Sequence, residues 1–455
     1  MAKVLMISAN LAREPYPVYP LGLTMVAESA RKKGHEVFDW DHLMHKGSCE
    51  ALQNFIDKQN PDFVGISLRN IDSVNFNEQK TYVPGYRELV QVIRNHTDAP
   101  IILGGAAFTI IPEAIMDSVK ADYGIIGEGE IAFTELIEAI ENGNPPQQKI
   151  LHSSEFISEE NIPVVDRNPD LTDFYLKKGG MLNVQTKRGC PHRCIYCSYP
   201  KLEGRVYRHR PAVEVVDEIE MLIKKHHADY LAMTDSVFND SIGKYLEIAE
   251  ELVRREISIP WMCFLRPDKF TKEEVALLAN SGLSSVEWGT DCATDTTLAA
   301  MKKDFTWDQV RYSNQLFADA GIANAHFIIF GGPGETEATV AEGLNNISKL
   351  ENCVVFGSIG VRVFPHTSMY DLAFKEGVIN REDDLIEPIF YFSEHIDRDK
   401  MHRQILESFN DRIDRIYPDG QLLEKTSAFH LLGYRGPIWD YILKKGQTRR
   451  QSHAR

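Results

Sequence analysis

The sequence predicts an α/β protein: a doubly wound, Rossmann-like N-terminal domain, a partial (β/α)6 barrel of the TIM type, and a mostly helical C-terminal appendage. Three observations predict this fold class. Short apolar runs alternate with helical segments over residues 1–145. The same alternation restarts at residue 181 after a proline-containing stretch, and it gives way to irregular and helical sequence after residue 380. We therefore expect domains at 1–145 and 181–380, a linker at 146–180 and a C-terminal region at 381–455.

The first domain shows the pattern of a parallel sheet that is buried on both faces. A segment with helical spacing, Leu21–Lys33, follows the first apolar run. The predicted strands are Val4–Ser8, Val37–Trp40, Phe63–Ser67, Ile101–Leu103 and Tyr123–Ile126. Sheets of this kind bind ligands at the carboxyl ends of their strands, which predicts binding loops at 8–11, 67–72, 104–109 and 127–130.

The second domain repeats a strand followed by a helix six times. Its predicted strands are Met181–Gln185, Tyr230–Met233, Trp261–Phe264, Ser285–Trp288, Ala325–Phe330 and Ser358–Phe364. In such barrels the functional site also lies at the carboxyl ends of the strands.

Composition and charge exclude several classes of protein. Hydrophobic residues make up 43% and charged residues 25% of the chain, which is typical of a folded soluble protein. A net charge of -16 disfavours nucleic acid as a partner, and the basic tail at Arg449, Arg450 and Arg455 is too short to reverse this. The segment Met1–Asn10 lacks the layout of a signal peptide, and no apolar run approaches the roughly 18 residues of a transmembrane segment. We expect a cytoplasmic protein.

The cysteines point to metal binding rather than to disulfides. Seven is an odd number for a disulfide framework, and three of the seven, Cys190, Cys194 and Cys197, fall within eight positions. The other four are interpreted as small buried hydrophobic residues: Cys49, Cys263, Cys292 and Cys353.

The spacing of the three cysteines is CxxxCxxC, directly after the first strand of the second domain. Three thiolates on one tight loop hold three irons of a cubane cluster and leave the fourth iron open to an exchangeable ligand. A zinc site would require a fourth N or S ligand and CxxC pairs, and His192 lies inside the first gap where it would strain to join. A cysteine loop without metal is the remaining alternative.

With Tyr196 directly before the last cysteine, this segment resembles the signature of the radical S-adenosylmethionine (SAM) superfamily. The resemblance implies an oxygen-sensitive [4Fe-4S] cluster held by Cys190, Cys194 and Cys197, with SAM on the open iron. It implies that the reduced cluster cleaves SAM to a 5′-deoxyadenosyl radical, under anaerobic conditions and with a reducing electron donor such as flavodoxin or ferredoxin. Tyr196 is then expected near the adenine.

The resemblance extends to four further candidate SAM-binding residues, with departures. Asp235 follows the second strand where relatives carry a Gly-Gly-Glu element, which is absent here, and its alternative role is a helix cap. Asp291 stands where relatives place a ribose-binding Glu. Arg266, at the end of the third strand, is a candidate partner for a carboxylate, or else part of a surface ion pair.

Gly332 belongs to a glycine-rich turn, Gly331–Thr336, that follows an apolar strand. The turn lacks the Gly-Lys-Ser/Thr end of a P-loop, which excludes nucleotide hydrolysis. It resembles the turn that lies near the adenine in radical SAM enzymes. His366, after the last predicted strand, either faces the substrate or is an ordinary loop histidine.

The first domain resembles the cobalamin-binding domain that precedes many radical SAM barrels. Four segments carry the resemblance in order and spacing: Pro20-Leu21-Gly22-Leu23, Gly34-His35-Glu36-Val37, Leu103-Gly104-Gly105 and Gly127-Glu128-Gly129-Glu130. Glycines allow the backbone to approach a large flat macrocycle, although doubly wound sheets without this ligand also contain them. The implied cobalamin-binding residues are Asn10, Ser67, Arg69, Gly104, Gly105, Gly127 and Glu128.

One departure concerns the lower face of the cobalamin. The stretch Asp41–Gly47 does not match the Asp-x-His-x-x-Gly pattern that supplies a histidine ligand to cobalt. We therefore expect no protein imidazole on the cobalt, and Arg69 is the side chain expected to crowd its lower face.

Taken together, the resemblances imply an enzyme that methylates an unactivated carbon of a small-molecule or lipid-like substrate, using two SAM molecules per turnover, with cobalamin delivering the methyl group. The alternatives are a radical rearrangement, cyclisation or oxidation with or without cobalamin, and a corrinoid- or SAM-sensing module without catalysis. A methylthiotransferase is disfavoured, because its first domain would supply three further cysteines and this one contains only Cys49.

Overall fold

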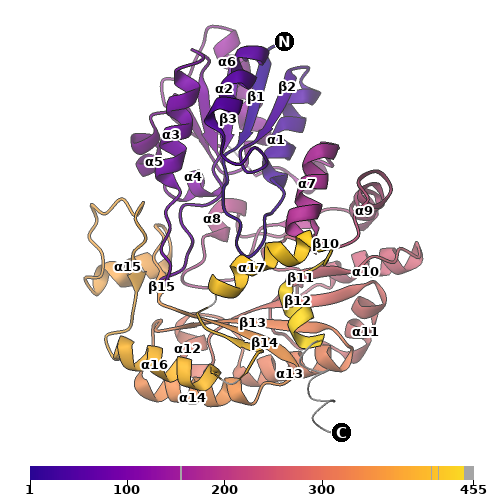
Figure 1. Cartoon of the computed structure of the whole chain (residues 1–455), viewed down its shortest axis with the longest axis vertical. Coiled ribbons are helices and arrows are strands. Elements are labelled where there is room, and N and C mark those ends of the chain that lie inside the picture. The colour runs from indigo at the N-terminus through magenta and orange to yellow at the C-terminus, as the bar shows by residue number, and fades with distance from the viewer. Residues whose placement is uncertain (154–155, 411, 419, 445–455) are drawn as a thin grey trace.

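Two parallel sheets, one for each half of the chain, organise the structure (Figure 1). The computed structural model describes residues 1–153, 156–410, 412–418 and 420–444. The basic residues Arg449, Arg450 and Arg455 lie outside the described residues. None of the helices in these ranges combines the length and the apolar character that crossing a bilayer requires.

The first sheet has six strands in the order β2-β1-β3-β4-β5-β6. The strands are β1 (Lys3–Ser8), β2 (Glu36–Asp41), β3 (Phe63–Ser67), β4 (Ile101–Gly104), β5 (Tyr123–Ile126) and β6 (Ile150–His152). Val4 on β1 pairs in parallel with Val37 on β2 and with Phe63 on β3, so the strand order reverses at β1. This is the switch point at which a doubly wound sheet leaves a crevice for a ligand.

Helices cover both faces of this sheet, as the sequence predicts. They are α1 (Leu21–Lys32), α2 (Cys49–Gln59), α3 (Val83–Arg94), α4 (Ala106–Ile110), α5 (Pro112–Val119) and α6 (Gly129–Glu141). α1 and α6 pack together on one face, where Leu23 and Phe133 belong to one buried cluster with Met6. α2, α3 and α5 cover the other face, and Leu52, Val90 and Ile115 lie in its core.

The segment 146–180, which the sequence predicts as a linker, contains structure of its own. β6 extends the first sheet, and η1 (Glu159–Asn161) and α7 (Pro169–Gly179) follow it. The Asn168 side chain accepts hydrogen bonds from the first turn of α7, and Gly180 ends the helix in the left-handed conformation. The domain boundaries themselves stay predictions.

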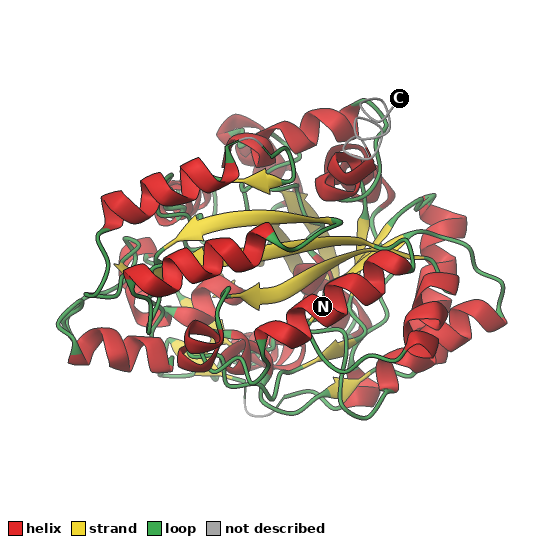
Figure 2. Ribbon diagram, turned by 90° about the horizontal axis from the view of Figure 1, so that it is seen from below, coloured by secondary structure: helices red, strands yellow, loops and turns green. Residues whose placement is uncertain are grey.

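The second sheet is an open, parallel, seven-stranded sheet in the order β17-β14-β13-β12-β11-β10-β7. Its strands are β7 (Leu182–Val184), β10 (Leu231–Met233), β11 (Trp261–Leu265), β12 (Leu283–Asp291), β13 (Ala323–Phe330), β14 (Cys353–Ile359) and β17 (Arg415–Ile416). The helices that connect them are α9 (Ala212–His226), α10 (Lys244–Arg254), α11 (Lys272–Asn280), α12 (Asp295–Ala300), α13 (Trp307–Asp319) and α14 (Glu337–Ser348). These helices are labelled in Figure 1, and Figure 2 shows from below how helices surround the strands. The six repeats of strand and helix confirm the predicted partial barrel.

The sixth predicted strand, Ser358–Phe364, is wrong in its position. β14 covers Cys353–Ile359, and Gly360 then adopts a left-handed conformation with φ of 76°. A Cβ at Gly360 would lie 2.6 Å from the ring of Phe392, so the chain can turn away from the sheet only with glycine here. The next residues form β15 (Val361–Arg362), which pairs antiparallel with β16 (Phe390–Tyr391).

The C-terminal region is mostly helical, as expected, and it also contributes to the barrel. Its helices are α15 (Ser368–Lys375), α16 (Arg398–Phe409) and α17 (Gly420–Leu431). β17 adds the seventh strand to the sheet, beside β14. Trp439 is buried against Phe327 and Phe356 in edge-to-face geometry, so the end of the chain covers one face of the barrel strands.

Candidate functional site

The three clustered cysteines lie on one short loop beside the carboxyl end of β7. The loop lies between β8 (Lys187–Arg188) and α8 (Tyr199–Glu203), and β8 pairs with β9 (Arg208–His209). Gly189 begins it with φ of 91°, and a Cβ there would lie 2.1 Å from the carbonyl oxygen of Val206. Only glycine fits this approach, which fixes the path of the chain into the first cysteine.

Hydrogen bonds hold the cysteine loop to the rest of the barrel. The Cys190 amide donates to the Gly204 carbonyl (3.0 Å), and the Ile195 amide donates to the Met301 carbonyl (3.2 Å). The Cys197 amide closes a turn onto the Cys194 carbonyl (3.2 Å). These bonds therefore fix the backbone positions of the three cysteines on one loop.

The environment of the thiols suits a cationic cluster rather than a single ion. Burial, and then the neighbouring Cys194 and Cys190 thiolates, raise the pKa of Cys197 to about 12. Three thiolates in this loop thus require a positive group to stay charged. Within the described part of the chain, no three His, Cys, Asp or Glu side chains approach closely enough for one metal ion. Cysteines that each bind a different iron of a cubane need not converge on one point, so the loop fits a cluster.

A buried lysine joins two of the predicted SAM-binding residues. Lys303 donates hydrogen bonds to the Asp291 carboxylate and to the Tyr196 hydroxyl (3.1 Å). The Tyr196 hydroxyl in turn donates to Asp291. Burial opposes the charge of Lys303, yet the Asp291 carboxylate raises the pKa of Lys303 above its usual range. The lysine is thus a fixed cation next to the cysteine loop.

Arg266 and Gly332 lie around the same segment. The Arg266 guanidinium donates to Nδ1 of His192 (2.6 Å) and to the Lys303 carbonyl, so it links the cysteine loop to the lysine. A Cβ at Gly332 would lie 3.6 Å from the Met301 sulfur. The structure therefore brings Tyr196, Arg266, Asp291 and Gly332 together around residues 301–303.

Asp235 lies apart from that group and supports the start of the cysteine loop. Its carboxylate accepts hydrogen bonds from the Thr186 amide (2.7 Å), from the Thr186 hydroxyl and from the Lys187 amide (3.2 Å). The side chain is buried, and its partners are all groups of the protein. In this arrangement Asp235 fixes the chain between β7 and β8.

A cavity of about 640 Å³ lies between the two sheets. In the orientation of Figure 1, the carboxyl ends of the first sheet form the upper wall of the cavity. The lower wall is formed by β7, β10, β11, β12 and α8 of the barrel domain. All seven residues predicted to bind cobalamin line this one cavity. α8 starts two residues after Cys197, so the cavity also borders the cysteine loop.

Two features of the upper wall suit a large ligand. A Cβ at Gly104 would meet no atom within 4 Å, so this part of the wall is open. Asn10 is buried, and its amide nitrogen has no hydrogen-bond partner within the described part of the chain. An open glycine wall beside an unsatisfied buried donor fits a macrocycle with acceptor groups on its edge.

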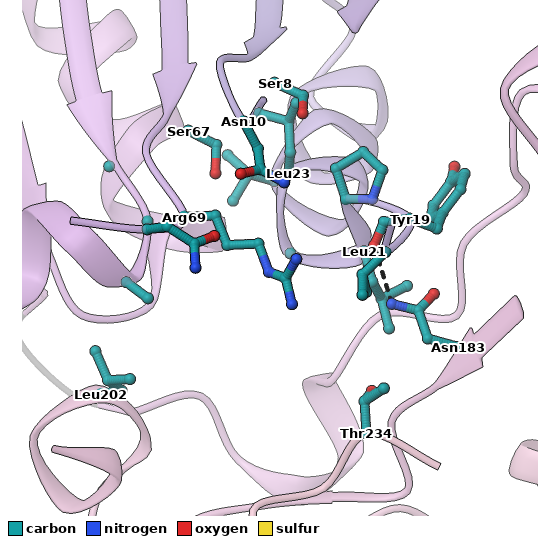
Figure 3. A pocket seen from close by; sticks show the side chains of 18 of the residues that line it. Ser8, Asn10, Tyr19, Leu21, Leu23, Ser67, Arg69, Asn183, Leu202 and Thr234 are labelled. Carbon is teal, nitrogen blue, oxygen red and sulfur yellow. Dashed lines mark hydrogen bonds between the residues drawn. The ribbon is translucent and has the colours of Figure 1, made fainter. Parts of the chain in front are cut away.

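Arg69 extends from the loop after β3 into the cavity, as Figure 3 shows. Its guanidinium makes no hydrogen bond or ion pair with the residues that the structure describes. No histidine lines the cavity within the described ranges: His42 is buried elsewhere, and His45 stacks on Trp40 at 3.8 Å. This geometry agrees with the expectation of a lower face without a protein imidazole, which stays a prediction.

Glu128 lines the cavity but is fully engaged with arginines of the barrel. Arg208 donates two hydrogen bonds to its carboxylate (2.7 and 2.9 Å), and Arg188 lies 3.1 Å away. Arg188 also donates to Glu130 (2.6 Å). Arg188 lies on β8, directly before the cysteine loop, and Arg208 lies on β9, which follows α8 and pairs with β8. Glu128 thus connects the first domain to that loop.

Sequence reasoning missed three residues of this site. Lys303 follows another lysine and has the pattern of an exposed pair, but it is only 5% exposed. Glu203 and Glu287 line the cavity from α8 and β12. Glu287 stands two positions before Gly289 and four before Asp291 on one strand, and this alternation is the signal that could have placed it on the inner face.

Comparisons with known proteins agree with both halves of the chain. The family model described as "B12 binding domain" matches residues 7–137, and the "Radical SAM superfamily" model matches residues 184–346. The tryptophan 2-C-methyltransferase of Streptomyces laurentii is 26% identical, over 78% of this chain and 72% of that protein. The anaerobic magnesium-protoporphyrin IX monomethyl ester cyclase of Rubrivivax gelatinosus is 28% identical, over 66% of this chain and 57% of that protein.

Solved structures share the whole fold. The radical SAM methyltransferase TsrM from Kitasatospora setae, with a tryptophan substrate and a SAM analogue bound, superposes with a TM-score of 0.86 at 24% identity, covering 99% of each chain. The cobalamin-dependent SAM radical enzyme OxsB superposes with a TM-score of 0.71 at 16% identity, over 94% of this chain and 71% of that chain. The chain belongs to the family of radical SAM enzymes that carry a cobalamin-binding domain ahead of the barrel.

Proposed function

We propose that the chain is a cobalamin-dependent radical SAM methyltransferase that transfers a methyl group to carbon of a small-molecule substrate. The observation that carries this proposal is the single cavity, because it is lined by the cobalamin-domain residues, by the inner strands of the barrel and by the helix that follows the cysteine loop. A methyl carrier and a substrate can meet there without a domain movement.

We assign the cluster to Cys190, Cys194 and Cys197, and the SAM site to the residues around Lys303. In this assignment Lys303 would bind the SAM carboxylate, because a fixed buried cation next to the cysteine loop suits that group. Asp291 accepts from the ribose hydroxyls, and Tyr196 packs near the adenine. Arg266 holds His192, and with it the first turn of the cysteine loop.

We assign the cobalamin to the upper wall of the cavity. Gly104 and Gly105 provide the flat surface, and Asn10 and Ser67 supply polar contacts. Arg69, which extends into the cavity, would lie next to the bound cobalamin, and its guanidinium would have no electron pair to donate to the metal. When bound, the cluster supplies electrons to SAM and the corrinoid carries the methyl group.

A cyclisation or oxidation is the second candidate, and the similarity to the magnesium-protoporphyrin cyclase favours it. The products of SAM distinguish the two reactions. Methyl donation leaves S-adenosylhomocysteine, whereas reductive cleavage alone leaves 5′-deoxyadenosine and methionine. A sensing module would form neither.

The test uses the anaerobically purified full chain, supplied with iron, sulfide, cobalamin, a reductant and SAM labelled in its methyl group. L-Tryptophan is the first substrate to try, because a relative that covers most of this chain acts on it. We expect S-adenosylhomocysteine to form only when cobalamin is present, and the label to appear on carbon of the substrate that is turned over. Formation of 5′-deoxyadenosine without S-adenosylhomocysteine would favour the second candidate.

A further inference from the structure

One acidic side chain in the cavity has no partner among the residues that the structure describes. Glu287 lies in the middle of β12, where it pairs in register with Phe264 on β11 and with Ala325 on β13. Its side chain lines the cavity on the barrel side. The carboxylate makes no hydrogen bond and no ion pair with any residue that the structure describes. The side chain is half-buried and borders the cavity, so its carboxylate is accessible to a ligand there.

The other acids of the cavity wall are all compensated. Glu128 and Glu130 pair with Arg208 and Arg188. Glu203 accepts from the Gln185 side chain (3.0 Å) and from the Gly189 amide (3.2 Å). The remaining acids are Glu14, which lies 3.9 Å from Lys80 at the rim, and Glu287. Glu287 is therefore the acid of the cavity wall for which the described residues provide neither a hydrogen bond nor an ion pair.

The surroundings of Glu287 are apolar and aromatic. Phe264 on β11, Ala232 on β10 and Met181 line the same wall. Tyr16 and Tyr199 lie close enough for their hydroxyls to be influenced by the Glu287 charge. Burial, and then the Asp291 carboxylate on the same strand, raise the pKa of Glu287 to about 8. A cation beside Glu287 would stabilise the charged carboxylate and so offset both the burial and the repulsion from Asp291.

The inner face of β12 also has room above Glu287. Gly289 is the next inward residue, and a Cβ there would meet only the Leu265 carbonyl oxygen, at 3.8 Å. Asp291 ends the strand after a shift in register, and it is paired with Lys303. A ligand that reaches Glu287 thus lies between the SAM residues and the upper wall, where the cobalamin is assigned.

We propose that Glu287 binds the ammonium group of the substrate, and that the substrate is a small amine with an apolar or aromatic body. This inference rests on the proposed function, since it places the substrate in the cavity shared with the cobalamin. Phe264, Tyr16 and Tyr199 would contact the body of the amine and, through their ring faces, its charge. Glu287 is a specificity residue in this proposal and takes no part in breaking or forming a bond.

Matched pairs of probes test the inference on the full chain loaded with cluster and cobalamin. Tryptamine and indole-3-propionate share the indole and the two-carbon arm and differ in the terminal charge, as do phenethylamine and 3-phenylpropionate. Affinity is measured by calorimetry without SAM. We expect at least one amine to bind about tenfold or more tighter than its matched carboxylate, the difference that one charge-assisted contact provides. Glu287→Gln should remove most of that preference.

Glu14→Gln is the matched control, because it makes the same change in a rim acid that is paired with Lys80. It should leave the preference for amines intact. The inference is overturned if no amine binds, if the carboxylates bind as tightly as the amines, or if Glu287→Gln binds amines as well as the wild type. Equal binding of a neutral probe such as 3-propylindole would show instead that Glu287 is protonated and does not select a cation.

A separate measurement distinguishes a failure of the amine-binding inference from a failure of the proposed function. Formation of S-adenosylhomocysteine from SAM, with reductant and without any probe, reports the methyl-donating chemistry alone. If the wild type forms no S-adenosylhomocysteine but binds amines through Glu287, the proposed function fails and the amine site stands.

Discussion

Arg362 on β15 donates a 2.8 Å hydrogen bond from its Nε to the carboxylate of Asp72, and both side chains are buried. The two residues are 290 positions apart. Asp72 ends the loop that carries Arg69 into the cavity, and Arg362 lies just beyond the last long strand of the barrel. This ion pair therefore connects the loop that contains Arg69 in the first domain to β15, which follows the barrel strand β14.

Asp72→Asn should weaken this connection. Arg362 would keep its bonds to the Leu385 and Val363 carbonyls (2.7 Å each) but would be left as a buried charge without a counterion. Removing one partner of a buried pair costs about 3 kcal/mol. We expect a lower melting temperature and weaker retention of cobalamin, because Arg69 lies in the same loop.

The double variant Asp72→Asn/Arg362→Met removes the stranded charge as well. Its melting temperature should lie above that of Asp72→Asn, since replacing Arg362 removes the buried guanidinium that has lost its counterion. A single variant as stable as the wild type, with cobalamin retention unchanged, would show that the ion pair does not hold the loop.

Cys194→Ala should abolish the cluster. The loop would keep two thiols, too few to hold the cubane, and both iron content and formation of 5′-deoxyadenosine should be lost. Cys49→Ala is the control. The expectation that Cys49 is buried was wrong, because it is exposed near the start of α2, whereas Cys263, Cys292 and Cys353 are buried as expected. Wild-type cleavage of SAM by Cys194→Ala would contradict the radical SAM assignment.

Gly104→Val should block the cobalamin site without disturbing the fold. A Cβ at Gly104 meets no protein atom within 4 Å, and a β-branched residue suits its strand β4. Cobalamin retention should therefore fall while iron content and melting temperature stay near the wild type. Gly85→Val, at an exposed position of α3, is the control. Undiminished corrinoid binding by Gly104→Val would place the cofactor elsewhere.

Gly105 is a less suitable position for this test. Its φ is 92°, and a Cβ there would lie 2.6 Å from the Leu68 carbonyl oxygen. A valine would thus distort the first domain even in the absence of cobalamin.

The pH dependence of stability should reveal the unpaired Glu287. Its pKa lies near 8 in the folded chain against a usual value of 4.5, so the folded state holds an extra proton between these values. Stability contributed by this group is complete below about pH 4.5 and is lost as the pH rises through about 8. The charged or titratable groups that face it are Asp291, Tyr16 and Tyr199.

Glu287→Gln cannot ionise at this position. The melting temperature of the wild type, relative to that of the variant, should therefore fall between about pH 5 and about pH 8. Because the wild type and the variant share all the other titrating groups, the contributions of those groups to the pH dependence cancel in the comparison. A difference that stays constant over this range would mean that Glu287 has an ordinary pKa and a partner.

Local patterns predicted most of the fold. The strands of the first sheet are continuous apolar runs, and CxxxCxxC is a local spacing, so both were visible along the chain. The end of the last barrel strand was misplaced, because a left-handed glycine at 360 divides an apolar run that otherwise looks continuous.

Long-range contacts could not be predicted in this way. Lys303 is buried only because Asp291 and Tyr196 meet it, and Tyr196 is 107 positions away. The pairs Asp72–Arg362 and Glu128–Arg208 likewise depend on how the two domains dock. The lack of a partner for Glu287 is visible only once every neighbour has been placed.

The most direct test of the central claim is a joint count of cofactors and products on one anaerobic sample. The full chain is purified with iron, sulfide and cobalamin, its iron and corrinoid contents are measured, and it is then given SAM and a reductant. We predict about four irons and about one corrinoid per chain, with S-adenosylhomocysteine formed only by the cobalamin-loaded protein. A chain that binds a single zinc ion, retains no corrinoid, or forms S-adenosylhomocysteine equally well without cobalamin would contradict the account.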